Sequence, residues 1–186
     1  MNVEYEINKE LGECYLFMGE YDKAADYYKK AQVAAPEIAE PYMGLAAVAL
    51  FAGDITGAHT LYAKAQQVEP NDKSLAGMAM VEVELGRHDE AFGHYADSLQ
   101  LNPGNMVAVN GMLQLAHHLN RLADAVPHLE AAVAAEAGDL EAVRYALAAC
   151  LTHLGREEEA KAHLEALLGA NPENGEAQQL YARFAA

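Results

Sequence analysis

The chain has 186 residues and carries 28 acidic against 12 basic side chains, for a formal net charge of −16. Such an acidic surface would repel phosphate backbones and anionic lipid headgroups, so nucleic acid and membranes are excluded as expected partners. The sequence also lacks an apolar run of about eighteen residues and, over Met1 to Glu10, the basic-then-apolar order of a secretion signal. We therefore expect a cytoplasmic protein.

One pattern of residues returns along the whole chain at intervals of 33 to 35 residues. An alanine marks each copy, at Ala24, Ala58, Ala91, Ala125 and Ala160. A glycine precedes four of these alanines, at Gly19, Gly53, Gly86 and Gly155, and a proline ends four copies, at Pro36, Pro70, Pro103 and Pro172. Self-similarity at a fixed period of this length indicates an array of repeated supersecondary units.

The first copy shows what each unit should be. Apolar residues at helical spacing predict one helix from about Tyr5 to Met18 and a second from about Asp22 to Ala35. Gly19 should end the first helix in the left-handed conformation, which a residue without Cβ adopts cheaply. Pro36 should stop the second helix, because proline cannot continue it. Each unit is thus predicted to be a helical hairpin.

The later copies follow the same scheme with local changes. Asn71, Asn105 and Asn174 are expected to cap the helices that follow them. Asn120 replaces the turn glycine in the fourth copy, where it tolerates the left-handed conformation next best. Pro127 falls inside a predicted helix, so that helix should start late or bend. A final helix over residues 175–186 should turn its apolar side chains inward.

The spacing of Leu11, Gly12, Tyr15, Ala24, Tyr28, Ala31 and Pro36, repeated downstream, resembles the tetratricopeptide repeat (TPR) family. This resemblance implies an all-α fold, a right-handed superhelical solenoid of helix–turn–helix units. The repeats fall at residues 5–38, 39–71, 72–105, 106–140 and 141–174, with a capping helix at 175–186, in a single array over residues 1–186. Departures occur at Asn8, Leu75, Val109 and Arg144, where the family often has an aromatic residue, and at Ala137, which replaces the repeat-end proline.

Small and large residues alternate at the predicted helix contacts. Gly12, Ala24 and Ala31 are expected to pack against tyrosines such as Tyr28, at the density of a protein interior. The two cysteines, Cys14 and Cys150, occupy equivalent positions four repeats apart, too far for a disulfide. Both are predicted to be buried thiols.

Catalytic motifs are missing from the sequence, including the nucleophile elbow, the phosphate-binding loop and the zinc-protease helix. We therefore expect no enzymatic activity and no cofactor. His94, His128 and His163 recur at one position of successive repeats and should form a half-exposed outer column. His117, His118 and His153 should cluster on first helices, but no acidic or thiol side chain joins them at helical spacing. Metal binding there stays an alternative, and no metal site is predicted.

The resemblance implies a concave groove lined by the first helix of each repeat. The predicted lining residues are Glu13, Leu16, Phe17, Met43, Leu50, Phe51, Met80, Val83, Asn110, Gln114, His117, His118, Tyr145 and His153. Seven of them, in the first three repeats, are apolar where water is expected, as is typical of an interaction surface. Packing between neighbouring repeats is the alternative explanation of these seven.

These observations predict a non-catalytic scaffold that holds a segment of a partner protein or peptide in the groove. The family's basic clamp for acidic C-terminal peptides is not expected, because Glu13 stands where that clamp has asparagine and Gly44, Ala76 and Gly77 lack its polar groups. Two alternatives remain: a bacterial secretion-type chaperone for apolar protein segments, and a module that self-assembles into a homo-oligomer through the same patch.

Overall fold

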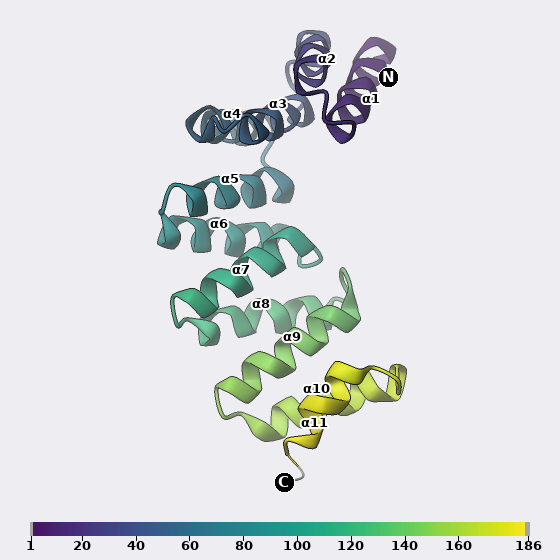
Figure 1. The fold of residues 1–186 in the computed structure, drawn as a ribbon, viewed down its shortest axis with the longest axis vertical. Helices are drawn as coiled ribbons and strands as arrows, with labels where there is room; N and C mark the ends of the chain where they lie inside the picture. The colour runs from purple at the N-terminus through teal and green to yellow at the C-terminus, as the bar shows by residue number, and fades with distance from the viewer. Residues whose placement is uncertain (1, 185–186) are drawn as a thin grey trace. The chain divides into compact units, whose positions relative to one another are not determined.

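The computed structural model describes residues 2–184, which fold into eleven α-helices and no strand (Figure 1). The helices are α1 (Val3–Phe17), α2 (Tyr21–Ala34), α3 (Glu40–Phe51), α4 (Ile55–Val68), α5 (Asp72–Glu84), α6 (His88–Leu101), α7 (Met106–His118), α8 (Leu122–Ala134), α9 (Leu140–His153), α10 (Glu157–Ala170) and α11 (Gly175–Ala182). They pack pairwise as five helical hairpins and a last helix, which confirms the predicted all-α repeat fold. None of the helices within residues 2–184 is long and apolar enough to cross a membrane.

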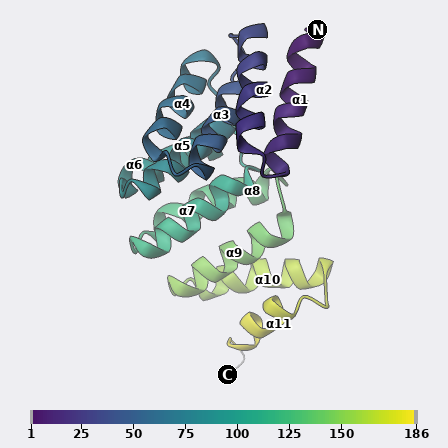
Figure 2. The ribbon, with the colours of Figure 1, turned by 45° about the horizontal axis from the view of Figure 1, so that its top comes forward.

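Two compact units divide the chain, one ending at Ser98 and one beginning at Leu99. In the first unit, α1 lies beside α2, as Figure 2 shows, and also contacts α3, and α4 packs on α5. In the second unit, α9 contacts α8 and α10, and α10 also contacts α11. The single array and its right-handed superhelical path stay predictions.

The turns inside the hairpins have the predicted backbone. Gly19 has φ of +74°, and Asn120, which replaces glycine in the fourth repeat, has φ of +56°. Both lie in the left-handed region that ends a helix by satisfying its last carbonyls. Helices α2, α4, α6 and α10 each end two residues before a proline, at Pro36, Pro70, Pro103 and Pro172. The sequence signals for helix ends are therefore confirmed.

The predicted asparagine caps are also confirmed. The side chains of Asn71, Asn105 and Asn174 accept hydrogen bonds from backbone N–H groups of the following first turn, at 2.9, 3.1 and 2.8 Å. Pro127 departs from one expectation, because α8 already begins at Leu122 and continues through the proline. A late start is therefore wrong. Both Pro127 and Ala123, whose carbonyl loses its helical donor, are exposed, so water can satisfy that carbonyl.

Tyrosine rings seated on glycines hold the first hairpins together. Tyr28, on α2, is only 3 % exposed and lies against Gly12 of α1 and Gly44 of α3. A Cβ atom at Gly12 would stand 2.8 Å from the ring, and one at Gly44 would overlap it. Tyr62 lies on Gly77 in the same way. This confirms the predicted packing of small residues against tyrosines.

Helix α11 closes the second unit. Its Ala177 and Leu180 are buried in a cluster with Ala148, Leu164 and Leu167 of α9 and α10. Asn174 caps it, and the Glu141 carboxylate at the start of α9 accepts hydrogen bonds from the side chains of Asn171 and Asn174 at 2.9 and 2.6 Å. The last two residues of the predicted capping helix, 185–186, lie outside the described residues.

The two cysteines differ in their surroundings. Cys150 is buried as predicted, but Cys14 is exposed, so the prediction is wrong for Cys14. In α9 this position is covered because α8 precedes and packs on the helix, whereas no helix comes before α1 among the described residues. Repeat position alone therefore does not determine burial at the first helix.

This difference predicts selective alkylation. Burial raises the pKa of the Cys150 thiol to about 11, so at pH 8 little thiolate is present and reagent cannot reach it. We expect iodoacetamide to modify Cys14 at least about a hundredfold faster than Cys150. Peptide mapping by mass spectrometry measures both rates, and unfolding in urea should equalise them. Equal rates in the folded protein would contradict the burial of Cys150.

Candidate interaction surface

Aromatic side chains gather where the first two hairpins turn. Phe17 ends α1 and is 94 % exposed, and Phe51 ends α3 and is 63 % exposed. Tyr21, the first residue of α2, stacks on Phe51 with ring centroids 5.1 Å apart and planes 13° from parallel. Both helices thus end in a phenylalanine that the protein itself leaves largely uncovered.

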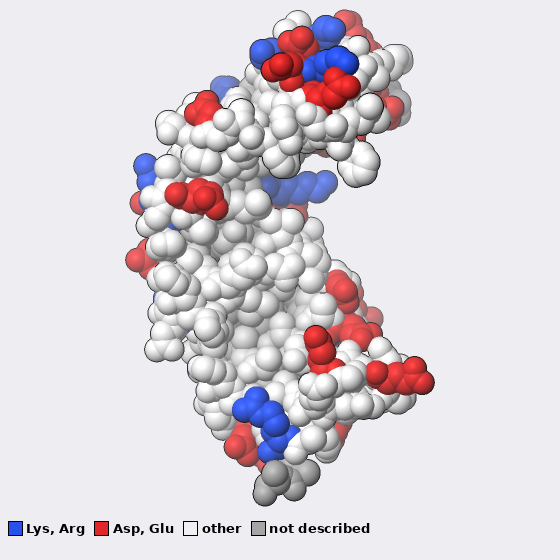
Figure 3. All heavy atoms as spheres, in the orientation of Figure 1, with Lys and Arg blue, Asp and Glu red and all other residues white. Residues whose placement is uncertain are grey.

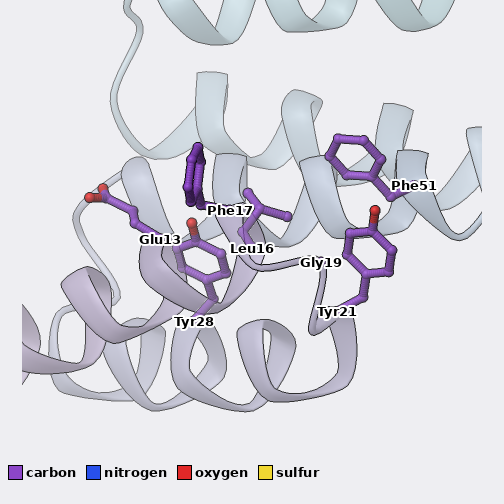
Figure 4. Close-up of a pocket in the computed structure, with 7 residues that line it drawn as sticks. All are labelled: Glu13, Leu16, Phe17, Gly19, Tyr21, Tyr28 and Phe51. Atoms are coloured by element: carbon purple, nitrogen blue, oxygen red, sulfur yellow. The ribbon is translucent and has the colours of Figure 1, made fainter.

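These residues surround a pocket of about 500 Å³, here named the aromatic pocket. It is lined by Glu13, Leu16, Phe17, Gly19, Tyr21, Tyr28 and Phe51 (Figure 4). In Figure 4, Phe17 stands on one side, the stacked Tyr21 and Phe51 on the other, and Leu16 between them. The pocket lies wholly within the first unit. Apolar walls with few polar groups are typical of ligand sites.

A single carboxylate supplies the charge of the pocket. Glu13 is exposed and forms no ion pair with any Lys, Arg or His that the structure describes. The lysines on the adjoining turns are already paired, Lys9 with Glu6 at 3.3 Å and Lys23 with Glu20 at 2.6 Å. Burial, with a smaller effect of Glu13, raises the pKa of Tyr28 to about 12, so its phenol stays neutral. Burial lowers the pKa of Lys9, but Glu6 and, more weakly, Glu13 raise it, so Lys9 attracts the Glu13 carboxylate without forming an ion pair with it. The pocket therefore carries one negative charge that no described cation pairs with directly.

The other apolar residues predicted for the groove are more covered. Met43 and Leu50 are half-buried and pack against the cluster around Ala46, Ala58 and Tyr62. Val83 is half-buried, whereas Met80 is exposed. The same cluster includes Val81 of α5, so Met43 and Leu50 pack at a contact within the second repeat and with the third, while Leu16, Phe17 and Phe51 line the pocket with Glu13.

The predicted residues of the fourth and fifth repeats lie in the second unit. Asn110, Gln114, His117, His118 and His153 are exposed, and half-buried Tyr145 lines a smaller pocket with Asp139, Glu141, Ala142, Asn174 and Glu176. The rings of His117 and His153 are 6.4 Å apart and tilted by 57°. Within residues 2–184, no three His, Cys, Asp or Glu side chains form a group that could hold a metal ion.

A buried carboxylate escaped the sequence analysis. Glu82, on α5, is 2 % exposed, and its Oε2 lies 2.6 Å from Nδ1 of His94 on α6. Its Oε1 lies 3.5 Å from Nε2 of His59 on α4. His94 was expected in a half-exposed outer column; it is half-buried and also contacts this carboxylate. The three side chains join three helices of the first unit.

Sequence reasoning also missed Tyr21 and Tyr28 as pocket residues. Both belong to α2, the second helix of the repeat, whereas the predicted groove used first helices only. The available signal was Tyr21 itself, an aromatic residue two positions after the turn glycine Gly19.

Charged side chains on the surface outside the pocket lie in several groups. On the face drawn in Figure 3, charged side chains form a few groups on a mostly uncharged surface, and acidic and basic side chains are mixed in the group at the top of the view. Given the net charge of −16, the protein as a whole presents an acidic environment to a partner.

The fold is that of a helical repeat protein whose unit is a hairpin of two helices. Its turns are formed by left-handed glycines, and its tyrosines pack on glycines of neighbouring helices. Family models described as tetratricopeptide repeat match residues 6–37 and 116–184. The chain belongs to the tetratricopeptide repeat family, whose members generally mediate protein–protein interactions.

One curated relative and several solved structures extend this finding. BBSome complex member BBS4 of Bos taurus is 30 % identical over 108 residues, which is 57 % of this chain and 20 % of that protein. The chain therefore spans about a fifth of the length of this relative.

The solved structures share the fold at low identity. Pseudomonas aeruginosa PilF has a TM-score of 0.70 at 20 % identity, covering 98 % of this chain and 83 % of its own. YrrB, described as a TPR protein with an unusual peptide-binding site, has a TM-score of 0.61 at 17 % identity, covering 96 % and 91 %. The first TPR of Spaghetti (RPAP3), solved with an HSP90 peptide, has 0.59 at 23 % identity, covering 64 % and 96 %.

Proposed function

We propose that this protein is a non-catalytic scaffold that holds a segment of a partner protein, with the aromatic pocket as its main anchor point. The observation that carries the proposal is the exposure of Phe17 and Phe51, at 94 % and 63 %, on the rim of one pocket. Exposed aromatic side chains in a contiguous patch mark interaction surfaces, and aromatic residues dominate binding energy when covered. The binding of peptides by structural neighbours supports the same class of function.

The expected energetics favour a partner longer than the pocket. Fully covering a phenylalanine contributes about 1.5–3 kcal/mol, so the two rings give about 3–6 kcal/mol before association costs. Those costs are of similar size or larger, so further contacts are needed for stable binding. We propose that exposed polar residues of the second unit provide a further contact surface, including Asn110, Gln114, His117, His118 and His153.

The test is capture by an immobilised double variant, Phe17→Ala with Phe51→Ala. We expect it to lose the proteins that the unaltered chain retains, as identified by mass spectrometry. Its far-UV circular dichroism should not change, because neither ring is buried. The matched control is Val33→Ala with Leu101→Ala, two exposed apolar residues outside the pocket, which should retain capture. Undiminished capture by the phenylalanine variant would falsify the assignment of the pocket.

Self-association is a second candidate, favoured by the same exposed rings. Two copies could cover Phe17 and Phe51 mutually, against the repulsion between two chains of charge −16. Light scattering over a dilution series distinguishes this from partner binding. A secretion-type chaperone would be a narrower form of the scaffold. It requires that the captured segment aggregates when released.

A further inference from the structure

We infer that the aromatic pocket selects a partner segment in which an arginine or lysine stands next to an apolar residue. The inference rests on the proposed function and specifies the chemistry of its ligand. The apolar residue would cover Phe17 and Leu16, and the cation would pair with Glu13.

The first argument is the charge of Glu13. Its carboxylate lines the pocket and forms no ion pair with a described residue, although Lys9, one turn earlier on α1 and paired with Glu6, attracts it from beyond ion-pair distance. A segment that covers the pocket removes water from this carboxylate, and a desolvated charge without a partner is strongly unfavourable. A wholly apolar segment would leave it unpaired, and an acidic segment would repel it. A ligand that brings its own cation avoids both penalties.

The second argument is the aromatic lining. Cations are attracted to the faces of aromatic rings within about 6 Å, and a guanidinium group also stacks on them. The first unit already makes such contacts elsewhere, with Nζ of Lys30 4.4 Å from the centre of the Tyr27 ring and Nζ of Lys23 5.2 Å from that of Tyr15. At the pocket, Phe17, Tyr21 and Phe51 have no such cation from the described part of this chain.

The third argument is the length of the side chain. Arginine and lysine carry an apolar stem that packs along hydrophobic surface while the charged end reaches a polar partner. Leu16 lies between Phe17 and the stacked pair of Tyr21 and Phe51, so it offers apolar surface for the stem, and Glu13 lines the same pocket. The net charge of −16 favours the approach of a basic segment over a long distance.

The experiment uses displayed random dodecapeptides as the probe. Peptides are selected on the full chain, and those that also bind the Phe17→Ala/Phe51→Ala variant are discarded. Each remaining peptide is synthesised in a charged and an uncharged version. In the uncharged version, citrulline, which has nearly the shape of arginine, replaces each arginine, and norleucine replaces each lysine. Dissociation constants are measured for the unaltered chain, for Glu13→Gln and for Glu10→Gln. Glu10 is a control because it is exposed on the same helix but does not line the pocket.

We expect the selected peptides to carry a basic residue beside an apolar one. Removing its charge should weaken binding to the unaltered chain and to Glu10→Gln about tenfold, and should change binding to Glu13→Gln less than about twofold. Pocket-dependent peptides without a cation, or an equal loss with Glu13→Gln, would overturn this inference and leave the proposed function standing. If no peptide depends on Phe17 and Phe51, both are overturned.

Discussion

Replacing Gly44 by alanine is expected to destabilise the first unit by about 1–3 kcal/mol, through overpacking. Helix propensity alone predicts the opposite effect on the free energy of unfolding, because alanine in a helix interior is normally about 1 kcal/mol more favourable than glycine. A Cβ atom at Gly44 would overlap the ring of Tyr28. The ring is buried and also lies against Gly12 on α1, so a shift that clears Gly44 would disturb that second contact. Either the ring or a helix must move.

The control for this prediction is Gly93→Ala on α6. No heavy atom lies within 4 Å of a Cβ placed there, so this change should stabilise the protein by about 0.5–1 kcal/mol. Gly77→Ala, opposite Tyr62, should behave like Gly44→Ala. Urea unfolding followed by circular dichroism measures all three. Stabilisation by Gly44→Ala would show that Tyr28 is not seated as described.

His94→Ala should cost about 1.5–3 kcal/mol, the range for a hydrogen bond to a charged group, because it leaves the buried carboxylate of Glu82 without this bond. The change removes the group 2.6 Å from the buried carboxylate of Glu82 and leaves only His59 at 3.5 Å. A buried carboxylate without a close partner loses its hydration without compensation. His59→Ala should cost clearly less, because its contact is longer.

A double-mutant cycle separates this charge effect from simple loss of packing. Glu82→Gln removes the buried charge, so combining it with His94→Ala should cost less than the sum of the two single changes. The interaction energy should be about 1–3 kcal/mol, from urea unfolding of the four proteins. Additive costs would mean that the two side chains do not stabilise each other.

The helix boundaries could be predicted because their causes are local. A turn glycine such as Gly19, a proline two residues after a helix, and a capping asparagine such as Asn71 act within one turn of the chain. The tyrosine packing was also predictable, since the repeat period places Tyr28 opposite small residues. Pro127 shows the limit of such rules, because solvent at an exposed helix face satisfies the group that the proline leaves open.

The candidate site was predictable only in part. Spacing gives the face of a helix on which a residue lies, but not how far the next helix covers it. Leu50 and Phe51 are adjacent, yet Leu50 packs on its neighbours and Phe51 stays 63 % exposed. Cys14 is exposed and Cys150 buried, in keeping with the packing of α8 on the helix of Cys150 and with the lack of a helix before α1 among residues 2–184. The contact of Glu82 with two histidines depends on how α4, α5 and α6 pack together, and the repeat period of the sequence does not give that packing.

The last helix has a consequence for how copies of this protein behave together. With eight residues, α11 is too short to persist alone in water, so its hold on the stripe of Leu164 and Leu167 maintains it. Without α11 that stripe would be open at one end of the second unit, ready to receive a helix from another molecule. Such a contact would join two different surfaces of neighbouring molecules, so it could repeat from molecule to molecule and form an open fibre rather than a closed oligomer. By burying Leu164 and Leu167 within its own chain, α11 removes this route of association between copies.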